Sequence, residues 1–176
     1  AMESGNDATK KMAQVVLLDS DFGKMPSIVA EGRRVVNNIQ RSTSLFLIKN
    51  IFSILLAISV SFLAFTYPIM PSQMSLISGF TIGIPGFFLA LEPNSERIKG
   101  RFIKTVFKNA LPAALTDFIL IFSLVLFSSA FGIKSEELSS AAICLMAFVG
   151  FTIIYQDSQP LNNYQSMVLL GHILAF

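Results

Sequence analysis

The residues of this sequence that could bind an ion or a substrate are polar residues inside long apolar stretches. Five of them carry oxygen atoms that a hard cation could use as ligands: Asn50, Ser53, Ser78, Thr81 and Asp117. Hard cations such as Ca²⁺ are bound by oxygen ligands. Asp117 is the strongest candidate, because a carboxylate inside an apolar helix is costly unless it is paired, protonated or facing a polar cavity. The four neutral residues are weaker evidence, since such side chains also hydrogen-bond between membrane helices.

Lys49 precedes the first of these candidates and has two explanations. Its long side chain can extend from an apolar helix toward the lipid headgroups, or it can be a charged partner inside a transport path. Other chemistry is excluded, because one His and one Cys cannot supply a nucleophile with its base or a zinc site. Cys144 and His172 are expected to be packing residues.

The elements that carry these residues are expected to be membrane helices. The chain has 176 residues, of which 53% are hydrophobic and 14% charged, against about 25% charged in soluble domains. A span needs about 20 apolar residues. We predict spans at about 45–67, 74–91, 110–131 and 138–155, and a truncated fifth helix at 164–176.

The distribution of basic residues predicts the orientation in the membrane. Twelve of the 13 Lys and Arg precede the first predicted span, lie at its start, or lie between the second and third spans. Basic residues accumulate on the cytoplasmic side, so we expect a multi-pass protein of the cell membrane with a cytoplasmic N-terminus. The lipid bilayer is the expected partner. Nucleic acid is not, because the net charge is only +2 and no basic run is interleaved with aromatic residues.

The first 43 residues differ from the rest and read as the end of an α/β unit. A short helix capped by Ser4, Asn6 or Asp7 is expected to run through Ala13. The run at 14–18 (QVVLL) is typical of a buried parallel strand, and Met25-Pro26 is expected to begin a second helix. One strand cannot form a sheet, so this piece needs a partner outside the chain.

The second predicted span contains its own breaking signals. Gly79 and Gly83 are four residues apart, which lets helices approach closely. Pro85 follows and removes one backbone hydrogen bond, so it should kink the helix. These residues can serve packing alone, or the broken helix can free carbonyl oxygens for an ion.

Four segments together resemble a known family. They are AMESGNDATK (1–10), VVLLDSDF (15–22), EGRRVVNN (31–38) and GIPGFFLALEPN (83–94). Their order and spacing are similar to the P-type cation-transporting ATPases, at the end of the phosphorylation domain and in the fifth and sixth membrane helices. The bacterial branch implicated in calcium uptake or export is the most similar.

The resemblance implies a fold and a domain organisation. The fold class is mainly α, a polytopic transmembrane helical bundle with an N-terminal α/β fragment of a HAD-like phosphorylation domain. Residues 1–22 would end that domain, 23–44 would form the stalk helix, and 45–176 the transmembrane region of helices five to eight and the start of nine. The chain would be a fragment, lacking the DKTGT segment with the phosphorylated aspartate, the nucleotide site, and the N-terminal helices and cytoplasmic domains. The parent would use ATP and Mg²⁺, neither bound by this fragment.

The resemblance also assigns ion ligands position by position. Asn50 matches an asparagine ligand of calcium pumps and Thr81 a threonine ligand. Ser53 stands where those pumps have a glutamate, Ser78 at an asparagine, and Ile82 at the shared aspartate. Both acidic ligands are therefore replaced, and neutral oxygens alone hold a divalent ion weakly.

Three functions remain open from the sequence. Calcium is the leading cation for a pump. A P-type pump for a monovalent ion, a polyamine or a lipid is the first alternative. Both acidic ligands of calcium pumps are replaced here, so a divalent ion would need negative charge from Asp117 and from absent helices. A free-standing four-helix regulator or scaffold is the second.

Overall fold

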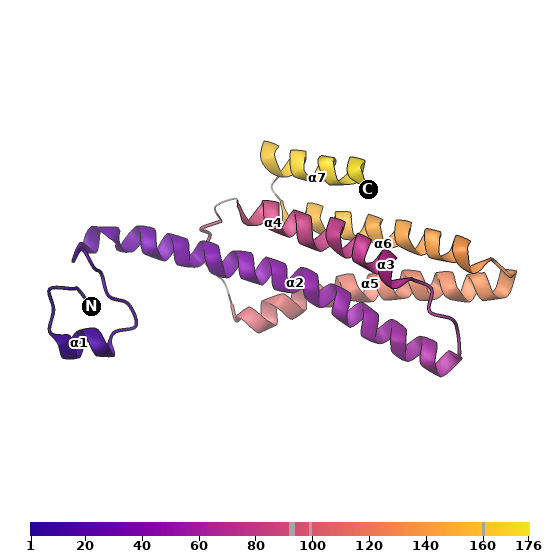
Figure 1. Ribbon diagram of the computed structural model, residues 1–176, viewed down its shortest axis with the longest axis horizontal. Coiled ribbons are helices and arrows are strands. Elements are labelled where there is room, and N and C mark those ends of the chain that lie inside the picture. Colours follow the sequence, from indigo (N-terminus) through magenta and orange to yellow (C-terminus); the bar gives the residue numbers. More distant parts are fainter. Residues whose placement is uncertain (92–93, 99, 160) are drawn as a thin grey trace. The chain divides into compact units, whose positions relative to one another are not determined.

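The computed structural model describes residues 1–91, 94–98, 100–159 and 161–176, and within these residues it is almost entirely helical (Figure 1). Glu92 and Pro93, which follow the second span predicted at 74–91, and the basic residue Lys99 lie outside the described residues. The described chain separates into two units, 1–37 with 94–98, and 38–93 with 99–176.

The first unit contains short helices and one isolated backbone pairing. Helix α1 (Asp7–Met12) is capped by Asn6, whose side chain accepts a hydrogen bond from the N–H of Ala8, as predicted. A 3₁₀ turn, η1 (Phe22–Lys24), precedes helix α2 (Met25–Leu63), which begins in this unit.

The predicted strand at 14–18 is not formed among the described residues. In its place Leu17 makes a single parallel bridge to Met2. The N–H of Leu17 donates to the carbonyl of Ala1 at 2.8 Å, and its carbonyl accepts from the N–H of Glu3 at 3.0 Å. A β-strand needs a paired neighbour along its length, and this pairing ends after one residue. The α/β part of the predicted fold class is therefore reduced to one bridge.

The second unit is built from helices that could cross a membrane. Among the described residues four helical segments are long and apolar enough, and they cover 22–63, 71–90, 102–131 and 135–157. The first segment corresponds to α2. The second is made of α3 (Pro71–Ser78), η2 (Gly79–Gly83) and α4 (Ile84–Ala90). The third is α5 (Phe102–Phe131), and the fourth is α6 (Ser135–Asp157). Helix α7 (Asn163–Ala175) is shorter and packs on α4 and α6. Helix α2 begins 20 residues before the span predicted at 45–67, and α5 begins eight residues before the span predicted at 110–131. The helical segments at 71–90 and 135–157 lie within three residues of the predicted 74–91 and 138–155.

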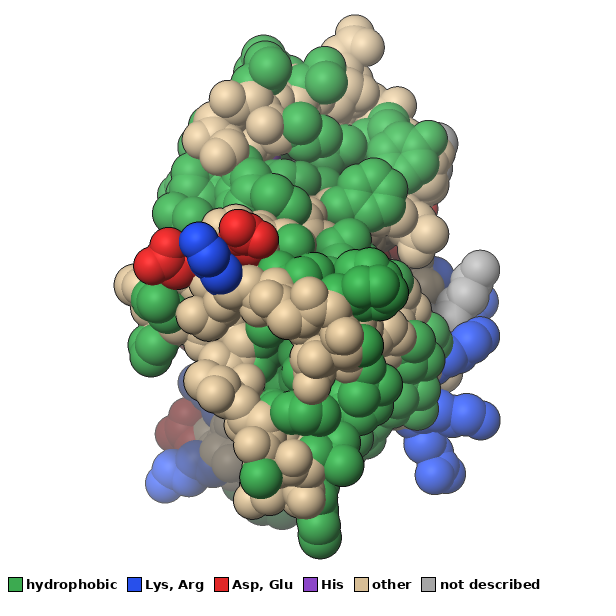
Figure 2. All heavy atoms as spheres, turned by 90° about the vertical axis from the view of Figure 1, so that its right-hand side faces the viewer, with side chains coloured by type: hydrophobic (Ala, Val, Ile, Leu, Met, Phe, Trp, Pro, Cys, Tyr) green, Lys and Arg blue, Asp and Glu red, His purple; other side chains and the backbone are tan. Residues whose placement is uncertain are grey.

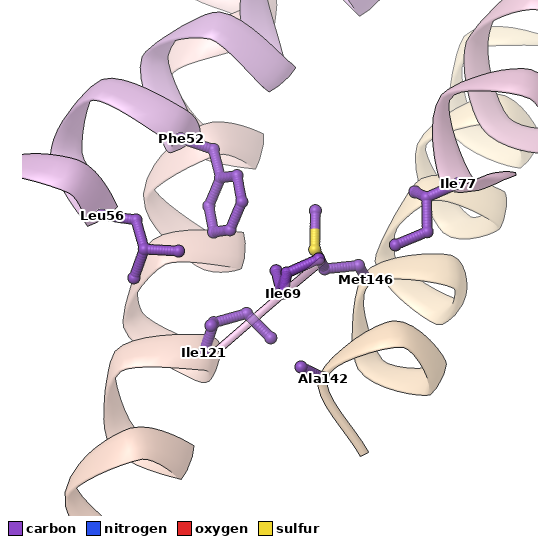
Figure 3. Close-up of a cluster of buried hydrophobic side chains, with 7 residues drawn as sticks. All are labelled: Phe52, Leu56, Ile69, Ile77, Ile121, Ala142 and Met146. Atoms are coloured by element: carbon purple, nitrogen blue, oxygen red, sulfur yellow. The ribbon is translucent and has the colours of Figure 1, made fainter. Parts of the chain in front are cut away.

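The core of this unit is an apolar cluster that joins four elements (Figure 3). Phe52 and Leu56 of α2 and Ile121 of α5 are fully buried there. They meet residues of α3, α6 and the connection before α3, namely Ile69, Ile77, Ala142 and Met146. Burial of these side chains fixes which face of each helix points inward.

Charged side chains are scarce at the end of this unit where α5 passes into α6. Figure 2 looks onto that end and shows mainly hydrophobic and uncharged polar surface, with a small group of acidic and basic side chains. Helix α5 ends at Phe131, and the connection begins with Gly132. The φ of Gly132 is 66°, in the left-handed region that glycine commonly adopts after a helix.

Candidate functional site

A small cavity lies among α2, α3, η2, α5 and α6 and is lined by three of the five predicted site residues. These are Ser78, Thr81 and Asp117. The volume of the cavity is about 30 Å³, measured as the space that the centre of a water molecule can occupy. One water molecule needs about 10–15 Å³ on this measure. The remaining walls are mostly apolar and include Ile77, Ile82 and Met146. The site is therefore small, enclosed by helices and polar on one side.

Asp117 is the acidic group of this cavity. Its exposed fraction is 6%, and its Oδ1 atom is buried without a hydrogen-bond partner among the described residues. A buried carboxylate without a partner is strongly unfavourable, so the group requires a proton or a cation. A cation in the cavity is one of these two ways to satisfy Asp117.

Lys49 lines the same cavity from α2. Among the described residues it makes no hydrogen bond or ion pair, and its side chain is half-buried. The ammonium group is therefore available to compete with an incoming cation for Asp117.

The two hydroxyl groups of the cavity are oriented by their own helix. Ser78 Oγ donates to the carbonyl of Met74 at 2.6 Å, and Thr81 Oγ1 donates to the carbonyl of Ile77 at 2.8 Å. Because each hydroxyl has only one proton to donate, its oxygen keeps lone pairs for another partner. Both are suited to face a cation.

A π-helical turn places Thr81 in the cavity. Residues Gly79–Gly83 form this turn, and the N–H of Ile84 donates five residues back to the carbonyl of Gly79. Pro85 follows in the first turn of α4 and has no N–H to give to the carbonyl of Thr81. Single π turns inside α-helices are frequent at functional sites. The helix is thus irregular near Pro85, through a π turn that ends two residues before the proline, and the kink expected at Pro85 stays a prediction.

Gly150 of α6 allows this turn to approach closely. A Cβ atom at position 150 would lie 2.5 Å from Cγ2 and 2.8 Å from Cβ of Thr81. Only glycine fits there without a shift of one helix. The sequence analysis missed this residue, although an isolated glycine in an apolar helix is a known signal of close packing.

The other two predicted residues lie elsewhere. Asn50 is exposed and does not line the cavity, and Ser53 lines a second cavity. Lys49 faces the first cavity, and the next residue is rotated by about 100° around the helix, which turns Asn50 away. Ser53 is one turn further along the same face, so it is displaced by about 6 Å along the axis.

The donor set has one carboxylate and few other strong ligands. Among the described residues no group of three or more His, Cys, Asp or Glu could hold a metal ion. A cation in this cavity would depend on Asp117 and two hydroxyl oxygens.

Two α2 side chains attach the ends of neighbouring helices, which the sequence did not reveal. Asn38 Nδ2 donates to the carbonyl of Ala90, the last residue of α4, at 3.0 Å. Arg41 pairs with the carboxylate of Asp157, the last residue of α6, at 2.8 Å, and also donates to its carbonyl at 3.2 Å. Carbonyls at helix ends lack partners inside their own helix, and α2 supplies them here.

Comparison with known proteins shows what the chain is related to. It is 33% identical over 190 aligned positions to the calcium-transporting ATPase CtpE of Mycolicibacterium smegmatis, covering 100% of this chain and 24% of that protein. It is 32% identical over 183 positions to the probable cation-transporting ATPase exp7 of Streptococcus pneumoniae, covering 99% of this chain and 24% of that protein. A calcium-transporting ATPase of Bacillus subtilis is 29% identical over 97 positions, 54% of this chain and 11% of that protein.

The chain thus spans about a quarter of the length of the curated relatives it matches most fully. No protein-family profile matches it. The resemblance found in the sequence motifs is confirmed by relatives that align over the whole chain. The chain therefore belongs to the P-type cation-transporting ATPases and corresponds to the C-terminal part of such a protein.

Proposed function

We propose that this chain is the membrane part of an ATP-driven cation pump and that the cavity at Asp117 is part of its ion path. The buried Oδ1 of Asp117, without a partner among the described residues, is the observation that carries the proposal. Its carboxylate and the hydroxyl oxygens of Ser78 and Thr81 would bind the cation. Asn50 and Ser53 would contribute only in another state of the pump.

The full protein would contain what this chain does not. A phosphorylation domain would use Mg²⁺ and ATP to form an aspartyl-phosphate, and residues 1–22 would complete it. Residues 23–44 would transmit the phosphorylation state to the membrane region at 45–176. The exposed apolar side chains of the first unit, including Leu18 and Phe22, support a partner surface of this kind. The basic residues favour a cytoplasmic N-terminus.

Calcium is the first cation to test, since two of the relatives are named calcium-transporting ATPases. Ca²⁺ takes six to eight oxygen ligands, usually with several carboxylates. The cavity has one carboxylate, so the absent helices would supply the others.

A monovalent ion or a polyamine is the second candidate, and one observation favours the monovalent ion. Lys49 lines the cavity with Asp117. When both are charged, the pair adds no net negative charge, and the lysine repels a divalent ion twice as strongly as a monovalent one at the same distance.

The deciding experiment uses the full-length protein in membranes. Asp117→Asn removes the charge at nearly constant size and should lower apparent affinity for the stimulating cation by about tenfold or more in an ATPase assay, equivalent to about 1.4 kcal/mol. Glu137→Gln is the control, because it makes the same chemical change at an exposed residue. Unchanged affinity in Asp117→Asn would rule out the site.

The ion and the parent are tested in the same preparation. Stimulation of ATPase activity by Ca²⁺ supports a calcium pump, and stimulation by K⁺, Na⁺ or a polyamine supports the second candidate. If the native protein has an intact mass near 19.3 kDa, ATP hydrolysis is excluded and a free-standing regulator or scaffold remains.

A further inference from the structure

A second, larger cavity lies where α2 ends and α3 and α6 begin. Its volume is about 660 Å³. Five hydroxyl-bearing residues line it: Ser53, Thr66, Tyr67, Ser135 and Ser139. None of its described lining residues is Asp, Glu, Lys or Arg. It is therefore a neutral cavity with many oxygen atoms, at the opposite end of the unit from the contacts of Asn38 and Arg41.

The outer cavity and the inner cavity at Asp117 are lined in part by the same apolar cluster. Met74 of α3 lines both cavities. Ile69 lines the outer cavity, whereas Ile77 and Met146 line the inner one. These three residues belong to the buried cluster of Figure 3, and Met74 packs against it. The inner and outer cavities thus both border one cluster and share Met74.

The chemistry of the two cavities and of the cluster that both border suits a gated path. Hydroxyl oxygens can replace part of the hydration shell of a cation, and a neutral lining binds it weakly enough to let it leave. A hydrophobic constriction stops ions when it is dry and conducts when it is wetted. Methionine is unbranched and flexible, so it can move aside at low cost.

Met74 is also connected to the binding site through its own helix. Its carbonyl accepts the hydroxyl of Ser78, which lines the inner cavity one turn later. The π turn that carries Thr81 follows at Gly79–Gly83. A change of helical register at this turn, when a cation binds, would rotate α3 and move the Met74 side chain.

We propose that the outer cavity is the extracytoplasmic vestibule of the cation path and that Met74 is the residue that closes it. The inference rests on the proposed pump function and adds to it the route between the binding site and the outside. The vestibule admits a partly hydrated cation, and the apolar cluster keeps it from the inner cavity in the state described here.

Access of water to the vestibule is tested with introduced cysteines in the full-length protein. The exposed native Cys144 is first replaced by Ser, together with any other cysteine of the full protein. Ser53→Cys should react with a membrane-impermeant methanethiosulfonate, added from outside intact cells, at least about tenfold faster than Leu76→Cys. Leu76 is the control because it lies on α3, is 48% exposed and lines neither cavity. Total thiol after denaturation in SDS is the reference for each variant.

The gate is tested by a second pair of variants. Ser78→Cys, in the inner cavity, should be protected from the same reagent and should become at least about tenfold more reactive when Met74→Ala is added. Met70→Ala is the matched control, because Met70 lines the outer cavity but not the inner one. Equal reactivity of Ser78→Cys with either alanine variant would show that Met74 is not the gate.

The outcomes separate this inference from the function on which it rests. If Ser53→Cys reacts no faster than Leu76→Cys while Asp117→Asn still weakens cation affinity, the pump stands and the vestibule is refuted. If Asp117→Asn leaves cation affinity unchanged, the proposed function fails and the vestibule fails with it.

Discussion

Substitution of Gly150 by alanine tests the close approach of α6 to the π turn. The added Cβ would lie 2.5 Å from Cγ2 of Thr81, whereas carbon atoms in good contact are about 3.5–4.0 Å apart. The helices must therefore separate locally by about 1 Å. Overpacking of this kind costs about 1–3 kcal/mol.

A control separates this steric cost from the effect of alanine on the helix itself. Alanine is favoured over glycine inside a helix by about 1 kcal/mol. Gly171→Ala in α7 should gain part of this, because a Cβ there meets no atom within 4 Å. The free energy of unfolding of Gly150→Ala should therefore lie about 1–3 kcal/mol below that of Gly171→Ala.

Thermal unfolding of the purified full-length protein in detergent measures the difference, and the cation-stimulated ATPase assay measures its effect on Thr81. The variant Gly150→Ala should unfold at a lower temperature and show weaker cation affinity. Addition of Thr81→Ser removes the nearest methyl group and should restore part of the stability lost. If both glycine variants are equally stable, the helices do not approach as described.

Two further predictions concern polar contacts between segments that are distant in the sequence. Arg41→Lys keeps the charge but cannot reproduce both contacts with Asp157, so thermal unfolding should show a loss of about 1 kcal/mol. The control is Arg34→Lys, whose 3.3 Å ion pair with Glu31 lies within one helix; it should change stability by less than about 0.5 kcal/mol, and equal effects would contradict the role of Arg41. Ser139→Ala removes the 2.7 Å hydrogen bond to the buried carbonyl of Pro68 and should lower the free energy of unfolding by about 1 kcal/mol. The control is Ser140→Ala, whose hydroxyl bonds its own helix at Glu136; its stability should be within about 0.5 kcal/mol of the parent. A larger loss in Ser140→Ala than in Ser139→Ala would refute the assignment.

The helices were predictable because local signals determine them. Apolar length located four helical segments that could cross a membrane. Asn6, one of three predicted caps, marked the start of α1, and Pro85 marked the region where the helical hydrogen bonding is irregular. The π turn itself was not predictable. A proline indicates a lost hydrogen bond, but whether the helix then kinks or forms a π turn depends on the neighbouring helices, here on Thr81 packed against Gly150.

The candidate site was predictable only in part, because position around a helix is a tertiary property. Ser78, Thr81 and Asp117 line one cavity, while Asn50 and Ser53 do not. Sequence spacing relates residues within a helix, but it does not say which face points inward. The contact between Arg41 and Asp157 joins residues 116 positions apart, and no local pattern could reveal it.

The contacts that α2 makes with the ends of α4 and α6 have a consequence for which sequence changes the protein tolerates. Asn38 binds a main-chain oxygen of Ala90, and Arg41 binds one of Asp157. A main-chain acceptor at position 90 is present whatever side chain stands there, so substitutions of Ala90 leave that contact possible. A one-residue deletion in α4 or α6 would instead move the acceptor by about 1.5 Å and 100°. Helix α4 is thus restricted in length more strictly than in composition at its last residue, whereas α6 also needs the carboxylate of Asp157 for its ion pair with Arg41.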